Sequence, residues 1–183
     1  MAQTPGAPSP APDDLAGQVR WLVDRAELQD LVAAYAMAVD DRDWDAVGEM
    51  YAEDSVFQGS LGPNRGRDAV VAYYRERTEQ FGATYHYPHS QVVTFTGPDT
   101  ASGTVAAHAE LAIGDETVVI ALRYADAYVR EGGRWRFRER TVQQLYAMPL
   151  SELPSGLAQP DRKRWPGTDP APADLPDVPG VPR

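Results

Sequence analysis

The stretch "TYHYPHSQVVTFTGPDTASGTVAAHAELAIGDETVVIALRYADAYVREGGRWRFRERTVQQLYA", residues 84–147, decides the fold of this chain. Apolar and polar residues alternate along it with a period near two, which is typical of β-strands. The short motifs TGPD, GDE and EGG interrupt the alternation, and each suits a hairpin turn. The pattern therefore predicts a meander of four long antiparallel strands, at residues 85–96, 100–113, 116–130 and 134–147.

Helical segments precede these strands. Asp13 and Asp14 can cap a first helix whose apolar residues recur at helical spacing as far as Val39, with a break near Asp24 left open. A short second helix begins at Asp43 and turns into a strand around residues 56–57. After the turn GSLGPNRG, residues 67–81 read as a third helix. Helices followed by long strands indicate an α+β fold, in which a curved antiparallel sheet wraps three N-terminal helices around a cavity.

Both ends of the chain differ from this central part. Residues 1–12 are rich in Pro, Ala and Ser and are expected to be disordered, whereas residues 13–148 form the domain. Residues 149–183 are a proline-rich tail that cannot form a long helix or a central strand. Its motif RKRWPG could fold back onto the acidic domain, and the last dozen residues are expected not to.

Composition limits the functions that the chain can have. The formal net charge is −10 and the pI is near 4.7, which argues against nucleic acid or an anionic membrane as a partner and favours a small neutral or apolar ligand. There is no cysteine, no apolar run of about 20 residues and no secretory signal, so a cytoplasmic protein is expected. No phosphate-binding glycine loop, Gly-x-Ser-x-Gly or His-Glu-x-x-His motif occurs, so no cofactor is expected.

Asp40, at the end of the first helix, is the first candidate for chemistry. A carboxylate at a helix C-terminus opposes the helix dipole, and Asp40, Asp41 and Asp43 all lie there. Tyr35 precedes Asp40 by five residues, about 140° around the helix axis, so the two side chains would flank one opening. The alternative is a solvated helix end.

Two histidines lie on the first long strand. His86 and His89 have an odd separation and must face opposite sides of a regular strand, which argues against a shared metal site. One of them is expected to point into the cavity, where a histidine suits proton transfer near neutral pH. The alternative is a histidine with an ordinary hydrogen bond.

Further side chains are expected around the cavity. Arg138, Arg140 and Gln144 are expected to share one face of the last strand. A buried arginine there would need a carboxylate partner, for which Glu110 and Asp40 are candidates. The residues expected to contact a substrate are Trp44, Tyr51, Phe57, His108, Tyr124 and Gln144.

The motifs RAELQDLVAAYAMAVDDRDWDAVGEMYAEDSVF (residues 25–57) and YHYPHSQVVTFTGPDTASG (residues 85–103) carry a family resemblance. The chain resembles the nuclear-transport-factor-2-like, or SnoaL-like, superfamily from about residue 23 to residue 146. It is most similar to the scytalone-dehydratase-like branch, which includes bile-acid 7α-dehydratase and hexachlorocyclohexane dehydrochlorinase. The resemblance implies a cone-shaped α+β barrel closed by three helices around a deep pocket.

The resemblance also implies roles for three residues. In those enzymes an aspartate at the end of the first helix holds a histidine that acts as the general base, and these positions fall on Asp40 and His86. The tyrosine of the bile-acid enzyme falls on Tyr35. A basic residue that some relatives use falls on Gln144, and His108 does not match the second catalytic histidine of scytalone dehydratase. Members of the superfamily commonly pair through the open face of the sheet, so the resemblance also implies a homodimer.

These observations lead to one hypothesis and several alternatives. The leading hypothesis is a cofactor-independent lyase, of the dehydratase type, that acts on a small, largely apolar molecule. An isomerase or cyclase of a polyketide-, steroid- or terpene-like substrate needs the same groups. A non-catalytic binding module would keep the pocket without an ionisable pair. An epoxide hydrolase would need an Asp–Arg–Asp set that the sequence does not clearly supply.

Overall fold

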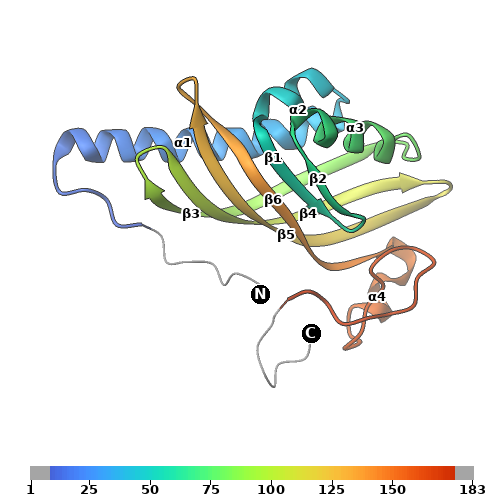
Figure 1. Ribbon diagram of the computed structural model, residues 1–183. Coiled ribbons are helices and arrows are strands. Elements are labelled where there is room, and N and C mark those ends of the chain that lie inside the picture. Colours follow the sequence, from blue (N-terminus) through green and yellow to red (C-terminus); the bar gives the residue numbers. More distant parts are fainter. Residues whose placement is uncertain (1–8, 176–183) are drawn as a thin grey trace.

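A computed structural model describes residues 9–175 of the chain (Figure 1). Its helices and strands occur in the order α1 (Leu15–Asp40), α2 (Trp44–Met50), β1 (Tyr51–Gly59), β2 (Gly62–Arg65), α3 (Arg67–Thr78), β3 (Thr84–Gly97), β4 (Thr100–Ile113), β5 (Glu116–Glu131), β6 (Arg134–Pro149), the 3-10 turn η1 (Leu150–Glu152) and α4 (Leu153–Gly156). The α+β fold predicted from the sequence is confirmed.

Six strands form one sheet in the order β2-β1-β6-β5-β4-β3. The four long strands β3 to β6 pair with their chain neighbours in antiparallel register, as the alternating pattern predicted. β1 differs because it pairs with β6 in parallel. The sequence reading missed β2, which lies in the segment interpreted as a turn. Gly59 and Gly62 face each other where β1 and β2 meet, and the φ of Gly62 is +107°, a conformation that side-chain-bearing residues rarely adopt.

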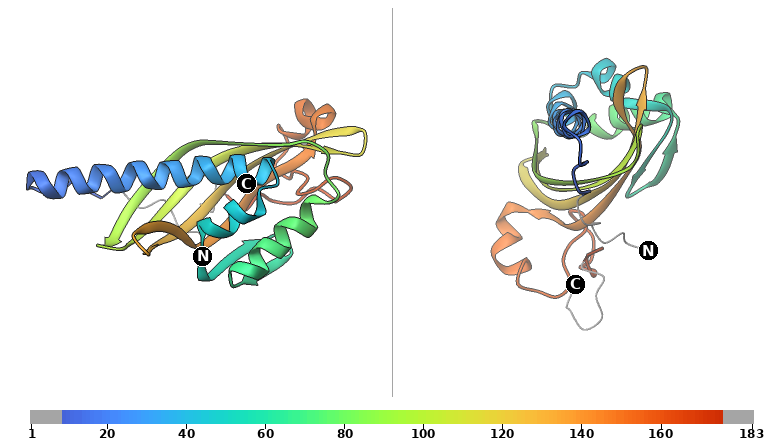
Figure 2. Two further views of the ribbon diagram at one scale, coloured as in Figure 1. Left: turned by 90° about the horizontal axis from the view of Figure 1, so that it is seen from above. Right: turned by 90° about the vertical axis from the view of Figure 1, so that its left-hand side faces the viewer.

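The sheet curves around the C-terminal half of α1 (Figure 2). Asp14 begins the helix by accepting a hydrogen bond from the backbone N–H of Gly17 at 2.8 Å. The helix then continues without the possible break near Asp24. Its buried residues lie mostly in the second half of the helix: Asp24, Leu28, Val32, Tyr35, Ala36, Ala38 and Val39. The C-terminal half of α1, which ends at Asp40, is therefore the part that enters the core.

A bulge in β6 changes the predicted facing of two arginines. Ala127 on β5 pairs with Glu139, but its neighbour Tyr128 pairs with Phe137, so Arg138 is the extra residue. Arg138 is consequently exposed, while Arg140 is fully buried. The prediction that the two share a face is wrong, because alternation along a strand is reset at a bulge.

The tail after β6 returns to the domain. The backbone N–H of Ala147 donates to the carbonyl of Lys163 at 2.9 Å, and Ala173 and Leu175 are buried. The expectation that the last dozen residues stay away from the domain is therefore wrong for these two, and residues 176–183 lie outside the described part. Residues 1–8 of the N-terminal tail lie outside it as well. The next residue, Ser9, accepts a hydrogen bond from the backbone N–H of Phe95 at 2.8 Å.

Candidate functional site

An apolar cavity of about 140 Å³ lies between the sheet, α1, α3 and the tail. The residues around it are Tyr35, Val39, Phe57, Gly59, Ser60, Tyr73, Tyr74, Arg77, Thr78, Phe81, Thr84, His86, Leu111, Ile120, Leu122, Tyr124, Val142, Gln144 and Trp165. Most are apolar or aromatic, with a few polar groups among them. This composition is typical of a site for a small organic molecule.

His86 and Asp40 are in contact at one side of this cavity. His86 Nδ1 lies 2.6 Å from Asp40 Oδ1, and the backbone N–H of His86 donates to Asp40 Oδ2 at 2.8 Å. An ionised carboxylate can only accept hydrogen bonds, so Nδ1 carries the proton and donates it. The second ring nitrogen, Nε2, is then unprotonated in the neutral ring. It has no hydrogen-bond partner within residues 9–175, and it is the nitrogen available to a bound molecule.

Thr84 and Arg42 hold the carboxylate from behind. Arg42 Nη1 donates to Thr84 Oγ1 at 2.7 Å, and the Thr84 hydroxyl donates to Asp40 Oδ1 at 3.0 Å. Because a guanidinium has no acceptor, its hydrogen bond directs the hydroxyl proton toward Asp40. Arg42 also donates to the carbonyls of Val39 and Gly82, at 3.0 Å each. The end of α1 and the start of β3 are thus joined around Asp40.

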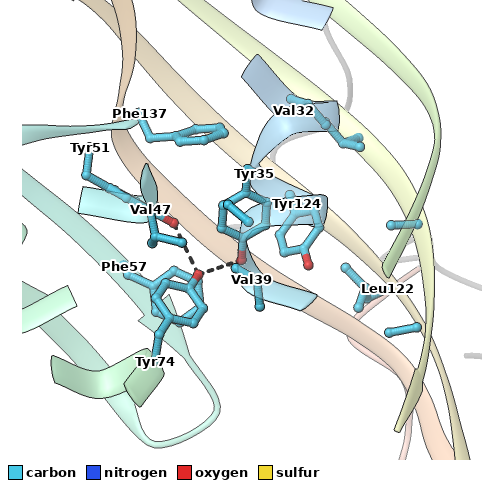
Figure 3. Packing of buried hydrophobic residues seen from close by; sticks show 14 of the residues in the cluster. Val32, Tyr35, Val39, Val47, Tyr51, Phe57, Tyr74, Leu122, Tyr124 and Phe137 are labelled. Atoms are coloured by element: carbon cyan, nitrogen blue, oxygen red, sulfur yellow. Dashed lines mark hydrogen bonds between the residues drawn. The ribbon is translucent and has the colours of Figure 1, made fainter. Parts of the chain in front are cut away.

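Tyr35 and Tyr74 line another side of the cavity and are linked with Tyr51 through their hydroxyl groups (Figure 3). The hydroxyl of Tyr74 lies 2.7 Å from that of Tyr35 and 3.1 Å from that of Tyr51. Burial raises the pKa of Tyr35, and the neighbouring Tyr51 raises it further. Burial likewise raises the pKa of Tyr74 well above its ordinary value. Both phenols therefore keep their protons at all ordinary pH values and can act as hydrogen-bond donors.

Arg140 supports these tyrosines from the core. Its guanidinium carbon lies 4.4 Å from the ring centre of Tyr35 and 4.2 Å from that of Tyr124. Its charge is balanced by Asp126, through hydrogen bonds of 2.8 Å from Nε and 2.7 Å from Nη2. The carboxylate partner of Arg140 is thus Asp126, and the expectation that Glu110 or Asp40 would pair with it is wrong.

The predicted site residues divide into three groups by their position. Five of them line the cavity: Tyr35, Phe57, His86, Tyr124 and Gln144. Asp40 lies behind His86 and Thr84 and touches both. Three expected substrate contacts lie elsewhere, and for these the prediction is wrong.

Each of the three misplaced residues has a physical reason. Tyr51 is fully buried behind Tyr74, which separates its ring from the cavity. Trp44 lines a separate surface depression between α2 and α3. His108 is exposed because it alternates with the buried Ala107 and Ala109 on β4. Its Nδ1 lies 2.7 Å from Nε2 of His89 on the outer face of the sheet.

Several cavity and supporting residues were missed by the sequence reading. Thr84 and Arg42 carry no pattern that separates them from ordinary strand and turn residues. Tyr74 was assigned to the core, and Arg77 was not singled out. Trp165 was noted within the tail motif, and it lines the cavity with its ring centre 6.0 Å from that of Phe81.

Residues 9–175 contain no group of three or more His, Cys, Asp or Glu side chains placed to hold a metal ion. Within the same residues no helix combines the length and the apolar character needed to cross a membrane.

The sequence profile of the SnoaL-like domain matches residues 20–141, which is more than half of the chain. The chain belongs to the SnoaL-like domain family. The resemblance inferred from the motifs on α1 and β3 is therefore confirmed. The match includes Asp40, His86, strands β1 to β5 and the first half of β6, and it ends before Trp165 and the rest of the tail.

Known relatives of this SnoaL-like protein include enzymes. The chain is 25% identical over 136 residues to the gamma-hexachlorocyclohexane dehydrochlorinase of Sphingobium indicum, covering 72% of this chain and 87% of that protein. The crystal structure of a type 2 hexachlorocyclohexane dehydrochlorinase has a TM-score of 0.69 at 22% identity, covering 72% and 92% of the two chains. A proposed scytalone dehydratase from Novosphingobium aromaticivorans has a TM-score of 0.66 at 18% identity, covering 70% and 89%. These structural likenesses show that the fold is shared.

Proposed function

We propose that this protein is a lyase or isomerase-type enzyme that acts on a small, largely apolar molecule bound in the cavity. The observation that carries the proposal is the 2.6 Å contact between His86 Nδ1 and Asp40 Oδ1 at the edge of an apolar pocket. The 25% identity to a dehydrochlorinase, which is a lyase, supports the same class of chemistry. Elimination of water is the reaction that we favour, and no cofactor takes part in it.

In the proposed reaction His86 Nε2 removes a proton from a carbon atom of the substrate. The electrons of that C–H bond form a double bond, and the leaving group departs from the adjacent carbon with its own bonding pair. Asp40 keeps the ring in the correct tautomer and stabilises the imidazolium that forms. The Tyr35 hydroxyl donates to the oxygen that gains charge or leaves. An isomerase would use the same base and donor, with the proton returned to another carbon.

The test of this proposal is a substrate screen. The purified protein is incubated with γ-hexachlorocyclohexane and with a panel of cyclic β-hydroxy ketones. Chloride release is measured for the first, and absorbance of the conjugated product for the second. Catalysed elimination on any of these, lost when His86 is replaced, is the expected result. Saturable ligand binding with no turnover on the whole panel would favour the binding-module alternative.

Replacing Tyr35 with phenylalanine is expected to lower kcat by roughly 10²-fold, as for the loss of one donor to a developing oxyanion, with little change in KM. The matched control is Tyr51→Phe, because its hydroxyl also contacts Tyr74 but does not line the cavity. Steady-state kinetics of both variants make the comparison. An equal loss in the two variants would contradict a direct role for Tyr35.

Replacing Trp165 with alanine is expected to weaken ligand binding by roughly tenfold, which corresponds to about 1.4 kcal/mol. The indole lines one side of the cavity and packs at an angle against Phe81, so its loss is expected to open the pocket to water. The free energy of unfolding should change less than the free energy of binding. Leu157→Ala is the control, since this exposed leucine belongs to the same tail but lies outside the cavity. Unchanged affinity in Trp165→Ala would show that the tail does not close the site.

A further inference from the structure

The cavity contains one permanently charged side chain. Among the residues that line it, Arg77 is the only arginine, lysine, aspartate or glutamate. Arg77 lies on α3 and is half-buried. The rest of the wall is apolar or neutral, apart from the titratable His86. A half-buried guanidinium in such a wall has fewer water molecules to bind than an exposed one, so a partner of opposite charge would be favourable there.

No carboxylate of the described residues supplies that partner. The guanidinium of Arg77 makes no ion pair and no hydrogen bond within residues 9–175. In the nearby tail, Lys163 pairs with Glu152 and Arg164 with Asp174. Arg162 donates to the carbonyl of Leu157 at 3.2 Å and does not line the cavity. The free charge at the cavity is therefore a property of Arg77 and not of the tail.

Two aromatic rings hold Arg77 in place. Its guanidinium carbon lies 4.5 Å from the ring centre of Trp165 and 5.5 Å from that of Phe81. An arginine held over aromatic faces is fixed without using its N–H groups, which point outward from the guanidinium plane. Those N–H groups match the two oxygens of a carboxylate in a bidentate pair. Trp165 is outside the family match, so this arrangement depends on a residue of the tail.

We propose that Arg77 binds a carboxylate group of the substrate and thereby sets substrate specificity. The preferred ligand is then a small apolar ring or chain that carries one carboxylate, with its carbon skeleton in the apolar part of the cavity beside His86. The link to catalysis rests on the function proposed above, whereas the carboxylate preference itself does not. The net charge of −10 repels anions in general, so such a preference must come from a local cation.

The test uses matched ligands that differ only in charge. Benzoate is compared with benzamide, and 2-naphthoate with 2-naphthamide, by isothermal titration calorimetry at low ionic strength on the full chain. The wild-type protein is expected to bind each carboxylate at least about tenfold more tightly than its amide, as for a charge-assisted hydrogen-bonded pair. Arg77→Met should abolish this ratio and leave the amide affinity within about twofold. Arg75→Met, which removes an equal charge from the same helix outside the cavity, should keep the ratio.

Three outcomes would overturn the proposal. Equal affinities for carboxylate and amide in the wild-type protein would show that Arg77 does not select a charged ligand over a neutral one. A parallel loss of both affinities in Arg77→Met would show that the residue only supports Trp165. No saturable binding of either carboxylate up to millimolar concentration would exclude this ligand class. His86→Asn separates the two proposals, because it should lose elimination activity while the carboxylate preference persists.

Discussion

Replacing His86 with asparagine is expected to lower kcat by roughly 10²–10⁴-fold, the range typical of a lost general base. Asparagine keeps a donor that can reach Asp40 but offers no nitrogen that can accept a proton. The fold should survive because His86 is only partly buried and its backbone N–H, which bonds Asp40, is unchanged. Single-turnover measurements on a substrate from the screen would separate the chemical step from binding.

The matched control is His89→Asn, which changes the same residue type on the same strand. His89 lies on the outer face, where its Nε2 contacts His108, so its loss should leave kcat within about twofold. Asp40→Asn provides a second comparison, since it removes the charge that orients the His86 ring. Full turnover by His86→Asn, or an equal loss in His89→Asn, would refute His86 as the base.

The sequence located the two partners of this contact, and the reasons are physical. Asp40 ends a helix whose buried face is readable from its period. His86 lies two residues after the buried Thr84, so both side chains point to the inner face of β3. That the two side chains touch follows from the family fold and not from spacing. Their catalytic roles stay predictions, to be decided by the kinetics above.

Other features could not be read from the sequence because they depend on breaks in regular alternation. The bulge at Arg138 separates it from Arg140, and the parallel pairing of β1 with β6 joins strands far apart in the chain. For the same reason, the sequence did not identify the carboxylate that pairs with Arg140. Asp126 reaches Arg140 only because β5 and β6 pair in this register. Register is set by turns, bulges and packing together.

The buried pair itself gives the largest expected effect on stability. Arg140 and Asp126 have no exposed side-chain surface, and Tyr128 also donates to Asp126 at 2.7 Å. Replacing Arg140 with methionine would leave a buried carboxylate without its cation, which is expected to lower the free energy of unfolding by about 3–5 kcal/mol. Urea unfolding followed by circular dichroism measures this. Arg138→Met, two residues earlier on β6, is the control, because its exposed pair with Asp54 should contribute less than about 1 kcal/mol.

A double variant separates stability from function. Arg140→Met with Asp126→Leu removes both charges, so it should recover much of the stability that the single variant loses. It should not recover activity, because Tyr35 and Tyr124 line the cavity and the cation packed against their rings is gone. A loss for Arg140→Met as small as that for Arg138→Met would show that the pair is not needed for folding. Recovery of both stability and turnover in the double variant would show that Arg140 has no part in positioning Tyr35.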